Sequence, residues 1–376
     1  DITLWGGYPA RGGPDAKRNR DKNKTVIDGS NNGPAIFIDT RQNVIVDGFL
    51  LRNGHETYIG GGVRIADSAS VTINNNDIQK CSAALWGGGI GINGGEDITL
   101  SNNLIGKNTA QQRGGALSLF HCDPCIVEKN VIKKNKARES GAGVALVESS
   151  VVVRENRIDH NKPLGGDFES GGGLDVVCLP GSTIDILDNV IEKNAGGNGA
   201  GLALYSCVGA TISRNMISQN ESDYDGGGVY FHGSSGEMER NIVQGNSARN
   251  WGGGLCLYGS QVDAAVNNLI TNNKARRNGG GISLYNASTA TIMNNTVARN
   301  KADLGSGLYI DGGTTATVTN SILWFNAGDQ IENGGTLNIT YSDVEDGGTG
   351  NGNINTNPKF VSASNFHLKN SSPCIN

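Results

Sequence analysis

The sequence predicts an all-β fold in the form of a right-handed, single-stranded parallel β-helix. Three observations predict it. A glycine-rich phrase recurs every 26 to 30 residues, the apolar residues beside it alternate with a period of two, and asparagines recur at two fixed places in each repeat. A repeat of this length is typical of a solenoid, in which each repeat buries its apolar face only against its neighbours.

The glycine phrase has three small residues followed by an aliphatic one, as in residues 252–255. Its third position falls at Gly62, Gly89, Ala116, Gly143, Gly173, Gly201, Gly228, Gly254, Gly281 and Gly307. No break in composition divides the 376 residues. We therefore expect one elongated domain, although the length would suffice for two or three ordinary domains.

Three short strands are predicted in each coil. Leu255 and Leu257 alternate after the glycine phrase, Ile98 and Leu100 alternate before an asparagine, and an apolar residue such as Ile105 follows that asparagine. A period of two marks strands with one buried face. Because no helix separates the strands, each coil returns to its start, and right-handed winding is the default for L-residues.

The asparagines are expected at the corners of the coil. One column is Asn76, Asn103, Asn130, Asn156, Asn189, Asn215, Asn241, Asn268 and Asn295; the other is Asn108, Asn135, Asn161, Asn194, Asn220, Asn246, Asn273 and Asn300. Asparagine tolerates left-handed backbone and its amide both donates and accepts hydrogen bonds. With coils about 4.8 Å apart, two ladders of hydrogen-bonded amides are predicted. Cys81 interrupts the second ladder in an early coil.

The two ends of the chain depart from the repeat. We expect an N-terminal cap and first strand in residues 1–34, the parallel β-helix in residues 35–345 and a C-terminal capping tail in residues 346–376, all within one structural domain. The β-helix would hold about 11 to 12 coils of ~27 residues. An end coil has no neighbour on one side and needs a cover.

Charge and hydropathy limit the partners. The net charge of −5 and the pI near 5.6 indicate no basic stripe for neutralising phosphates, so no nucleic-acid partner is expected. The chain contains no apolar run of 18 residues, and no transmembrane segment is predicted. A leader could precede Asp1, or the chain could be an excerpt of a longer polypeptide. We expect a monomeric solenoid or a part of a larger surface protein.

The paired phrases, Gly-Gly-Gly/Ala-aliphatic and Ile/Val-x-x-Asn, resemble the repeats of bacterial cell-surface β-helix proteins, among them the polymorphic outer-membrane protein passengers. Those passengers usually have Phe where this chain has Ile or Val. The phrases at residues 353–360, 366–368 and 371–376 resemble the end of secreted β-helix proteins with a choice-of-anchor segment. The resemblance implies a secreted or cell-surface protein, and it transfers no catalytic residue.

Side chains two and four positions after the glycine phrase are expected to point outward from the first strand. The candidate ligand-binding residues among them are Asp175, Tyr205, Tyr230, His232, Tyr258, Tyr285, Tyr309 and Asp311. Rings about 4.8 Å apart could stack on the sugars of a linear polysaccharide. The same rings could instead pack on one another and only stabilise the face.

Carboxylates before two glycine phrases are candidate ligands for Ca²⁺, which prefers oxygen ligands: Asp167 and Glu169, then Asp223 and Asp225. Two coils, about 10 Å, separate the two clusters, so they are not expected to share one ion. Solvated loop carboxylates are the simpler interpretation, and no cofactor is required by the sequence.

Seven cysteines are too few for a disulfide scaffold. Cys178 and Cys207 lie at similar positions of successive coils, so stacking could bring them close enough for a disulfide. Cys122 and Cys125 lack a second Cys-x-x-Cys pair for zinc, which leaves a local disulfide or two free thiols. A disulfide would support an oxidising compartment.

The functional hypothesis is a secreted or cell-surface module with a structural or adhesive role, which could bind extended polysaccharide on its outer sheet face. The alternative is a polysaccharide lyase or glycoside hydrolase acting on a linear, neutral or acidic polysaccharide, with Asp175, Tyr230 and His232 as its cluster. Such enzymes need paired acids at a defined separation, or a base with a charge-neutralising cation or Arg. No convergent catalytic set is evident, and the five histidines form no evident triad, so the catalytic residues are unknown.

Overall fold

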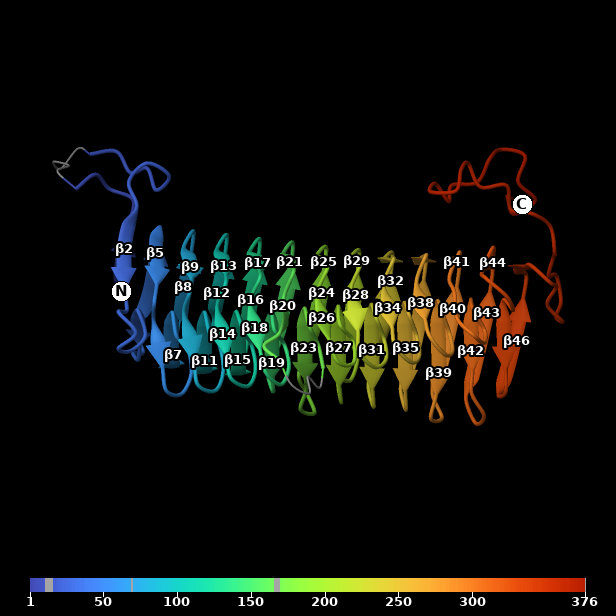
Figure 1. Ribbon diagram of the computed structural model, residues 1–376, viewed down its shortest axis with the longest axis horizontal. Coiled ribbons are helices and arrows are strands. Elements are labelled where there is room, and N and C mark those ends of the chain that lie inside the picture. The colour runs from blue at the N-terminus through green and yellow to red at the C-terminus, as the bar shows by residue number, and fades with distance from the viewer. Residues whose placement is uncertain (11–15, 69, 166–169, 376) are drawn as a thin grey trace. The chain divides into compact units, whose positions relative to one another are not determined.

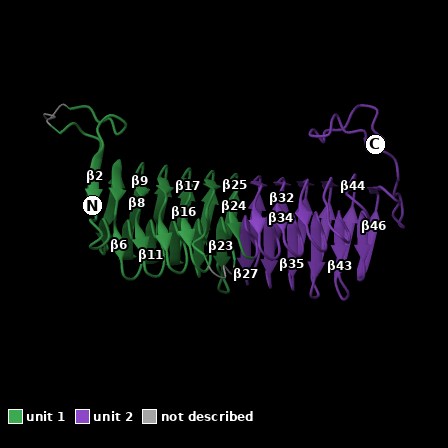
Figure 2. Cartoon of the chain, in the orientation of Figure 1, with its two compact units in different colours: residues 1–197 green, residues 198–376 purple. Residues whose placement is uncertain are grey.

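The computed structural model describes residues 1–10, 16–68, 70–165 and 170–375. It divides into two compact units, residues 1–197 and residues 198–376, coloured green and purple in Figure 2. Both units consist of short strands that pair in parallel with the equivalent strands of the neighbouring coils (Figure 1). Among the described residues no helical segment has the length and hydropathy needed to span a bilayer.

Each coil of unit 1 contributes one strand to each of three long stacks. The first stack follows the glycine phrases and contains β3 (Ile36–Ile38), β7 (Val63–Ser68), β11 (Ile90–Gly95), β15 (Leu117–Cys122), β19 (Val144–Val147) and β23 (Leu174–Val177). The second contains β1 (Ile2–Trp5), β4 (Asn43–Asp47), β8 (Ser70–Asn74), β12 (Ile98–Ser101), β16 (Cys125–Glu128), β20 (Val151–Arg154) and β24 (Ile184–Leu187). The third contains β2 (Thr25–Asp28), β5 (Phe49–Arg52), β9 (Asp77–Gln79), β13 (Leu104–Gly106), β17 (Val131–Lys133), β21 (Arg157–Asp159) and β25 (Val190–Glu192).

Unit 2 repeats this arrangement. Its first stack contains β27 (Leu202–Tyr205), β31 (Val229–His232), β35 (Leu255–Tyr258), β39 (Ile282–Tyr285), β42 (Leu308–Ile310) and β45 (Ile331–Asn333). The second contains β28 (Ala210–Ser213), β32 (Ser235–Glu239), β36 (Gln261–Val266), β40 (Thr289–Met293), β43 (Thr315–Thr319) and β46 (Thr336–Thr340). The third contains β29 (Met216–Ser218), β33 (Ile242–Gln244), β37 (Leu269–Thr271), β41 (Thr296–Ala298), β44 (Ile322–Trp324) and β47 (Asp343–Val344).

A fourth, two-residue strand, which the sequence pattern does not predict, follows the second asparagine column. In unit 1 these strands are β6 (His55–Glu56), β10 (Ser82–Ala83), β14 (Thr109–Ala110), β18 (Lys136–Ala137) and β22 (Lys162–Pro163), with β26 (Ala195–Gly196) at the end of the unit. In unit 2 they are β30 (Glu221–Ser222), β34 (Ser247–Ala248) and β38 (Lys274–Ala275). Two residues are too short to show a period in the sequence.

The core lies inside the coils, as the alternation predicts. Ile73, Leu100 and Val127 occupy the same register of β8, β12 and β16, and each is fully buried. Equivalent inward positions therefore form continuous apolar columns, each of which is buried only because the coils stack.

The asparagine ladders are confirmed. Asn108 donates from its backbone N–H and its side-chain amide to Oδ1 of Asn135, at 2.9 and 3.2 Å, and the Asn135 amide donates to Oδ1 of Asn161 at 2.9 Å. The second donor of the Asn135 amide bonds the Ile105 carbonyl at 3.0 Å. Cys81 ends this ladder, because its N–H donates to Asn108 but its side chain has no amide. The buried amides thus have partners for both donors and the acceptor.

The residue before each ladder asparagine has a left-handed backbone. Lys107, Lys134 and Asn272, for example, have φ of 61°, 58° and 56°. Such backbone is the sharp corner that the sequence pattern predicts, but it falls on the residue before the asparagine and not on the asparagine itself.

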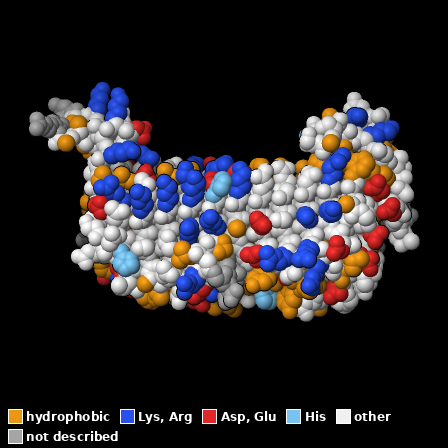
Figure 3. Space-filling view, in the orientation of Figure 1, with side chains coloured by type: hydrophobic (Ala, Val, Ile, Leu, Met, Phe, Trp, Pro, Cys, Tyr) orange, Lys and Arg blue, Asp and Glu red, His pale blue; other side chains and the backbone are white. Residues whose placement is uncertain are grey.

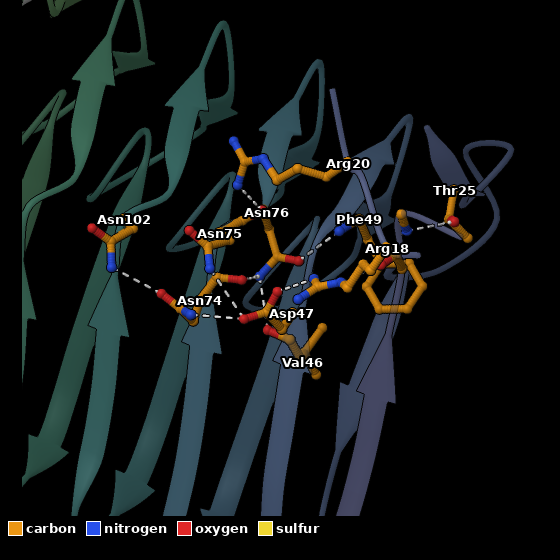
Figure 4. A network of polar contacts seen from close by, with 12 residues as sticks. Arg18, Arg20, Thr25, Val46, Asp47, Phe49, Asn74, Asn75, Asn76 and Asn102 are labelled. Atoms are coloured by element: carbon orange, nitrogen blue, oxygen red, sulfur yellow. Dashed lines mark hydrogen bonds and ion pairs between the residues drawn. The ribbon is translucent and has the colours of Figure 1, made fainter. Parts of the chain in front are cut away.

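The N-terminal segment packs against the first coils through a polar network (Figure 4). Arg18 forms an ion pair with Asp47, whose carboxylate also accepts from the amides of Asn74 and Asn75 at 2.7 and 3.1 Å. Arg20 donates to the Asn75 carbonyl. The network holds the segment against the first asparagine corner.

The C-terminal tail packs on unit 2. Its Phe360 is 8% exposed and contacts Ala298 and Trp324, the last residues of β41 and β44. Ile354 forms a parallel bridge with Asp343 and so extends the third stack by one layer. The tail therefore covers apolar side chains of β41 and β44 that would otherwise face water.

Candidate functional site

The candidate site is a cluster of aromatic side chains on the first stack of unit 2. Tyr205, His232, Tyr258 and Tyr285 occupy the same register, at the last position of β27, β31, β35 and β39. A parallel stack places equivalent residues of neighbouring coils side by side, about 4.8 Å apart, so one aromatic residue per coil produces a continuous row. We call these four residues the aromatic row.

The rings of the aromatic row contact one another edge to face. The ring centroids are 5.4 Å apart for Tyr205 and His232, 4.9 Å for His232 and Tyr258, and 4.9 Å for Tyr258 and Tyr285, with interplanar angles of 70°, 87° and 75°. This geometry is favourable for neighbouring aromatic rings. The row therefore presents both ring faces and ring edges, and is not a column of parallel rings.

Exposure differs along the row. His232 is exposed, Tyr205 and Tyr258 are half-buried, and Tyr285 is only 7% exposed. A ligand that reaches this face would meet the first three side chains.

A second layer, two positions after the glycine phrases, lies beside the row. Tyr230 is 5% exposed and Cys256 is fully buried, and both pack with Tyr285 in one apolar cluster. Tyr230, predicted as an outward-pointing ligand-binding residue, is covered by neighbouring side chains of this cluster, and its role in binding stays a prediction. Burial raises the pKa of the Tyr230 and Tyr285 hydroxyls and of the Cys256 thiol.

Asp225 is the carboxylate of this cluster. Its Oδ2 accepts a hydrogen bond from the Tyr285 hydroxyl at 2.8 Å, and its Oδ1 accepts one from the Trp251 backbone N–H at 3.1 Å. Burial raises the pKa of the Asp225 carboxyl, and the hydrogen bonds from Tyr285 and Trp251 oppose that rise. Asp225 thus links three successive coils beneath the aromatic row.

Trp251 belongs to the cluster but is not among the residues predicted from the sequence. Its ring centroid lies 4.4 Å from that of Tyr285. Trp251 and Asp225 both stand immediately before a glycine phrase. The position before the phrase is therefore a further column, and an aromatic residue there is the signal that could have identified Trp251.

Tyr309 and Asp311 lie one coil further along. The Tyr309 hydroxyl contacts Asp311 Oδ1 at 3.4 Å, and burial together with the Asp311 charge raises the Tyr309 pKa. Tyr309 is in register with Ser283 and so belongs to the second layer. In the described part of the chain no ring contact joins it to the aromatic row.

Asp175 belongs to unit 1, whereas Tyr230 and His232, the other two residues of the predicted cluster, belong to unit 2. Asp175 is 1% exposed and accepts a hydrogen bond from the Ser170 hydroxyl at 2.7 Å. The turn at Gly171, before β23, packs against Asp175 and covers it, and the role of Asp175 in ligand binding stays a prediction.

The candidate calcium ligands have other partners or are not described. Asp167 and Glu169 lie outside the described residues. Asp223 is exposed and pairs with Arg249 at 3.3 Å, whereas Asp225 points into the aromatic cluster. Across residues 1–10, 16–68, 70–165 and 170–375 no three His, Cys, Asp or Glu side chains form a metal-binding group. Calcium binding stays a prediction.

The cysteines divide into three groups. Cys122 and Cys125 form a disulfide, one of the two alternatives left open by the sequence. Cys81 and Cys256 are buried free thiols, and Cys374 is a partly buried thiol whose pKa is raised to about 12 by burial and by Asp343. Cys178 and Cys207 are buried in unit 1 and unit 2, respectively, and their pairing stays a prediction.

The chemistry of the cluster suits contact more than bond cleavage. Its exposed part consists of the Tyr205, His232 and Tyr258 side chains, which offer ring surface, hydroxyls and an imidazole. Its carboxylate, Asp225, is held by donors on two neighbouring coils. A glycosidase needs two carboxyl groups that flank the scissile bond, and Asp225 already uses both of its oxygens.

Comparison with known families agrees with the fold. The family model described as the right handed beta helix region matches residues 34–206, 89–264 and 176–366, three overlapping stretches that cover most of the chain. Neither the curated proteins nor the solved structures include a match. The parallel stacks, the period of about 27 residues and the family match establish the predicted winding. The chain belongs to the right-handed β-helix family.

Proposed function

We propose that the protein is a secreted or cell-surface module that binds an extended glycan through the aromatic row of unit 2. One observation carries the proposal: Tyr205, His232 and Tyr258 lie in adjacent coils, in register, and all three are at least partly exposed. Aromatic rings pack against the C–H surfaces of sugars, and their polar tips remain free for hydrogen bonds. The row follows the axis of the stack, as a linear ligand would.

The cluster beneath the row supports a binding role. Ring contacts hold His232 and Tyr258 on both sides, and the buried Asp225–Tyr285 hydrogen bond fixes one end of the row. A surface that is rigid before binding loses little conformational entropy on binding. The Cys122–Cys125 disulfide fits an oxidising, extracellular compartment.

The test is a binding measurement with a panel of neutral linear glycans, on the wild-type chain and on the double variant Tyr205→Ala/Tyr258→Ala. Because each ring contact contributes about 0.5–1.5 kcal/mol, the double variant should bind about tenfold more weakly or worse. The matched control is Tyr341→Ala, since Tyr341 is 58% exposed and lies outside the cluster.

Unchanged affinity of the double variant for the glycan would show that the aromatic row is not the binding surface. The same samples should be incubated with neutral and acidic polysaccharides. New reducing or unsaturated ends would show bond cleavage and favour an enzyme over a binding module.

A further inference from the structure

Unit 1 carries a column of basic side chains that the proposed function does not use. Each residue lies just after a strand of the third stack and just before the second asparagine ladder. The column consists of Lys80, Lys107, Lys134, His160 and Lys193, one residue from each of five successive coils. All five side chains are exposed. We call these residues the lysine column, and Figure 3 shows Lys and Arg side chains gathered over β9, β13, β17 and β21.

Backbone geometry does not explain the lysines. The five residues have φ between 54° and 61°, a left-handed region that favours glycine and asparagine. The equivalent corners of unit 2 carry Gln219, Gly245, Asn272, Arg299 and Phe325, with the same sign of φ. Lysine has no conformational advantage at such a corner, so its recurrence in unit 1 points to its charge.

Among the described residues, His160 lies 2.7 Å from Asp159, whereas the four lysines of the column have no partner of opposite charge. In the described part of the chain none of Lys80, Lys107, Lys134 and Lys193 forms an ion pair. Other cations of the same unit do pair: Arg154 lies 2.6 Å from Glu128, and Arg157 lies 2.8 Å from Asp159. Like charges one coil apart, about 4.8 Å, repel one another, and a bound polyanion would relieve that repulsion.

A shallow cavity of about 250 Å³ lies at the middle of the column. Gly106 and Leu104 of β13 line it together with Lys107, Lys133 and Lys134. Gly106 is in register with Gln79 and Lys133, and a Cβ atom at this position would lie 3.2 Å from the Lys133 carbonyl oxygen. The missing side chain therefore leaves space beside three ammonium groups.

The anionic group nearest the cavity is Asp77, at its other end. Burial raises the pKa of the Asp77 carboxyl, and the charges of Lys24, Arg20, Lys133 and Lys107 oppose this rise. One carboxylate among these cations leaves a net positive field along the groove.

We propose that the lysine column and its groove bind a linear acidic polysaccharide, with carboxylate or sulfate groups aligned to the ammonium groups of successive coils. From Lys80 to Lys193 the column spans four coil steps, about 19 Å, with a lysine at four of its five positions and coils about 4.8 Å apart. Duplex nucleic acid carries one charge per ~1.7 Å, which is far denser. Single strands are usually held by aromatic stacking, and the residues beside the column in β9, β13 and β17 are Gln79, Gly106 and Lys133.

This inference does not depend on the glycan proposed for the aromatic row. The experiment uses the full chain and measures affinity for a polyuronate, a sulfated glycosaminoglycan, a neutral glucan and single-stranded DNA at several salt concentrations. The variant is Lys107→Gln/Lys134→Gln. The matched control is Lys274→Gln/Lys301→Gln, which removes two exposed lysines from unit 2.

Wild type should bind at least one acidic polysaccharide through this column. Any binding of the neutral glucan should not involve the column. The column variant should bind the acidic polymer at least tenfold more weakly, and the slope of log affinity against log salt should fall by about 1.4, roughly 0.7 per lost contact. Gly106→Gln should weaken binding without changing that slope. The proposal would be overturned if the control variant lost as much affinity for the acidic polysaccharide as the column variant, or if the column variant kept its affinity. Binding of single-stranded DNA as tight as that of the polysaccharide would also overturn it.

Discussion

The two units share an interior and differ at their surfaces. Both contain the same three long stacks and the same buried asparagine ladders. At the fourth position of the first-stack strands, however, unit 1 has Phe120 and Val147 where unit 2 has Tyr258 and Tyr285. At the corner before the second ladder, unit 1 has mainly lysine and unit 2 does not. Stacking constrains the inward positions, so differences in function are expected at corners and outward positions.

The largest effect should come from the shared interior. We expect Asn135→Ala in unit 1 and Asn273→Ala in unit 2 each to lower the free energy of unfolding by about 3 kcal/mol, because each leaves buried backbone and amide groups without partners. Both asparagines are fully or almost fully buried and make equivalent bonds to the next coil, at 2.9 and 3.0 Å. Chemical denaturation measures both values. A difference of more than about 1 kcal/mol between them would contradict a common interior.

A smaller effect should be confined to unit 2. Tyr285→Phe removes the hydroxyl that donates to Asp225 and should lower the free energy of unfolding by about 1–2 kcal/mol. The control is Tyr258→Phe, at a half-buried ring of the same row, which should change stability by less than about 0.5 kcal/mol. Equal losses of unfolding free energy in the two variants would show that the Tyr285–Asp225 hydrogen bond does not stabilise the fold.

Asp225 should also make stability depend on pH. Burial raises its pKa above the ordinary 3.8, so the folded chain binds this proton more tightly than the unfolded chain. Its contribution is fully present below pH 3.8 and is lost as the pH rises through the folded-state pKa. Asp225→Asn should therefore flatten the fall in unfolding free energy above pH 4, as measured by denaturation at a series of pH values. An unchanged pH profile would contradict the buried position of this carboxylate.

The smallest effect should distinguish the two sets of corners. Lys134→Asn in unit 1 should be neutral or stabilising by about 0.5 kcal/mol, because asparagine tolerates the left-handed backbone better and repulsion along the column falls. Asn272→Lys at the equivalent corner of unit 2 should be neutral or slightly destabilising. A clear loss of stability in Lys134→Asn would mean that the lysine has a structural role.

The sequence predicts those features that repeat. Period, strand alternation and asparagine spacing identify the β-helix and both ladders, because every coil repeats the same residue pattern. Burial of Tyr230 and Asp175 could not be predicted in this way, because alternation tells which side of a strand a residue faces but not what covers that side. Trp251 and Asp225 belong to a column before the glycine phrase that has no common residue type.

The lysine column was missed for a different reason. The net charge of −5 describes the whole chain, and it conceals one line of exposed basic residues on unit 1, whose four lysines form no ion pair in the described part of the chain. The sequence does show a lysine or histidine before five successive ladder positions, but its significance depends on the backbone conformation and on the missing ion pairs. Both become known only from the structure.

The most direct test of two separate surfaces on one scaffold is a crossed binding experiment. An acidic polysaccharide and the best neutral glycan are each titrated into Lys107→Gln/Lys134→Gln and Tyr205→Ala/Tyr258→Ala. The account predicts that the lysine variant loses at least tenfold in affinity for the acidic polymer alone, and that the tyrosine variant loses about tenfold for the neutral glycan alone. Equal losses of affinity for both ligands in both variants would contradict this account.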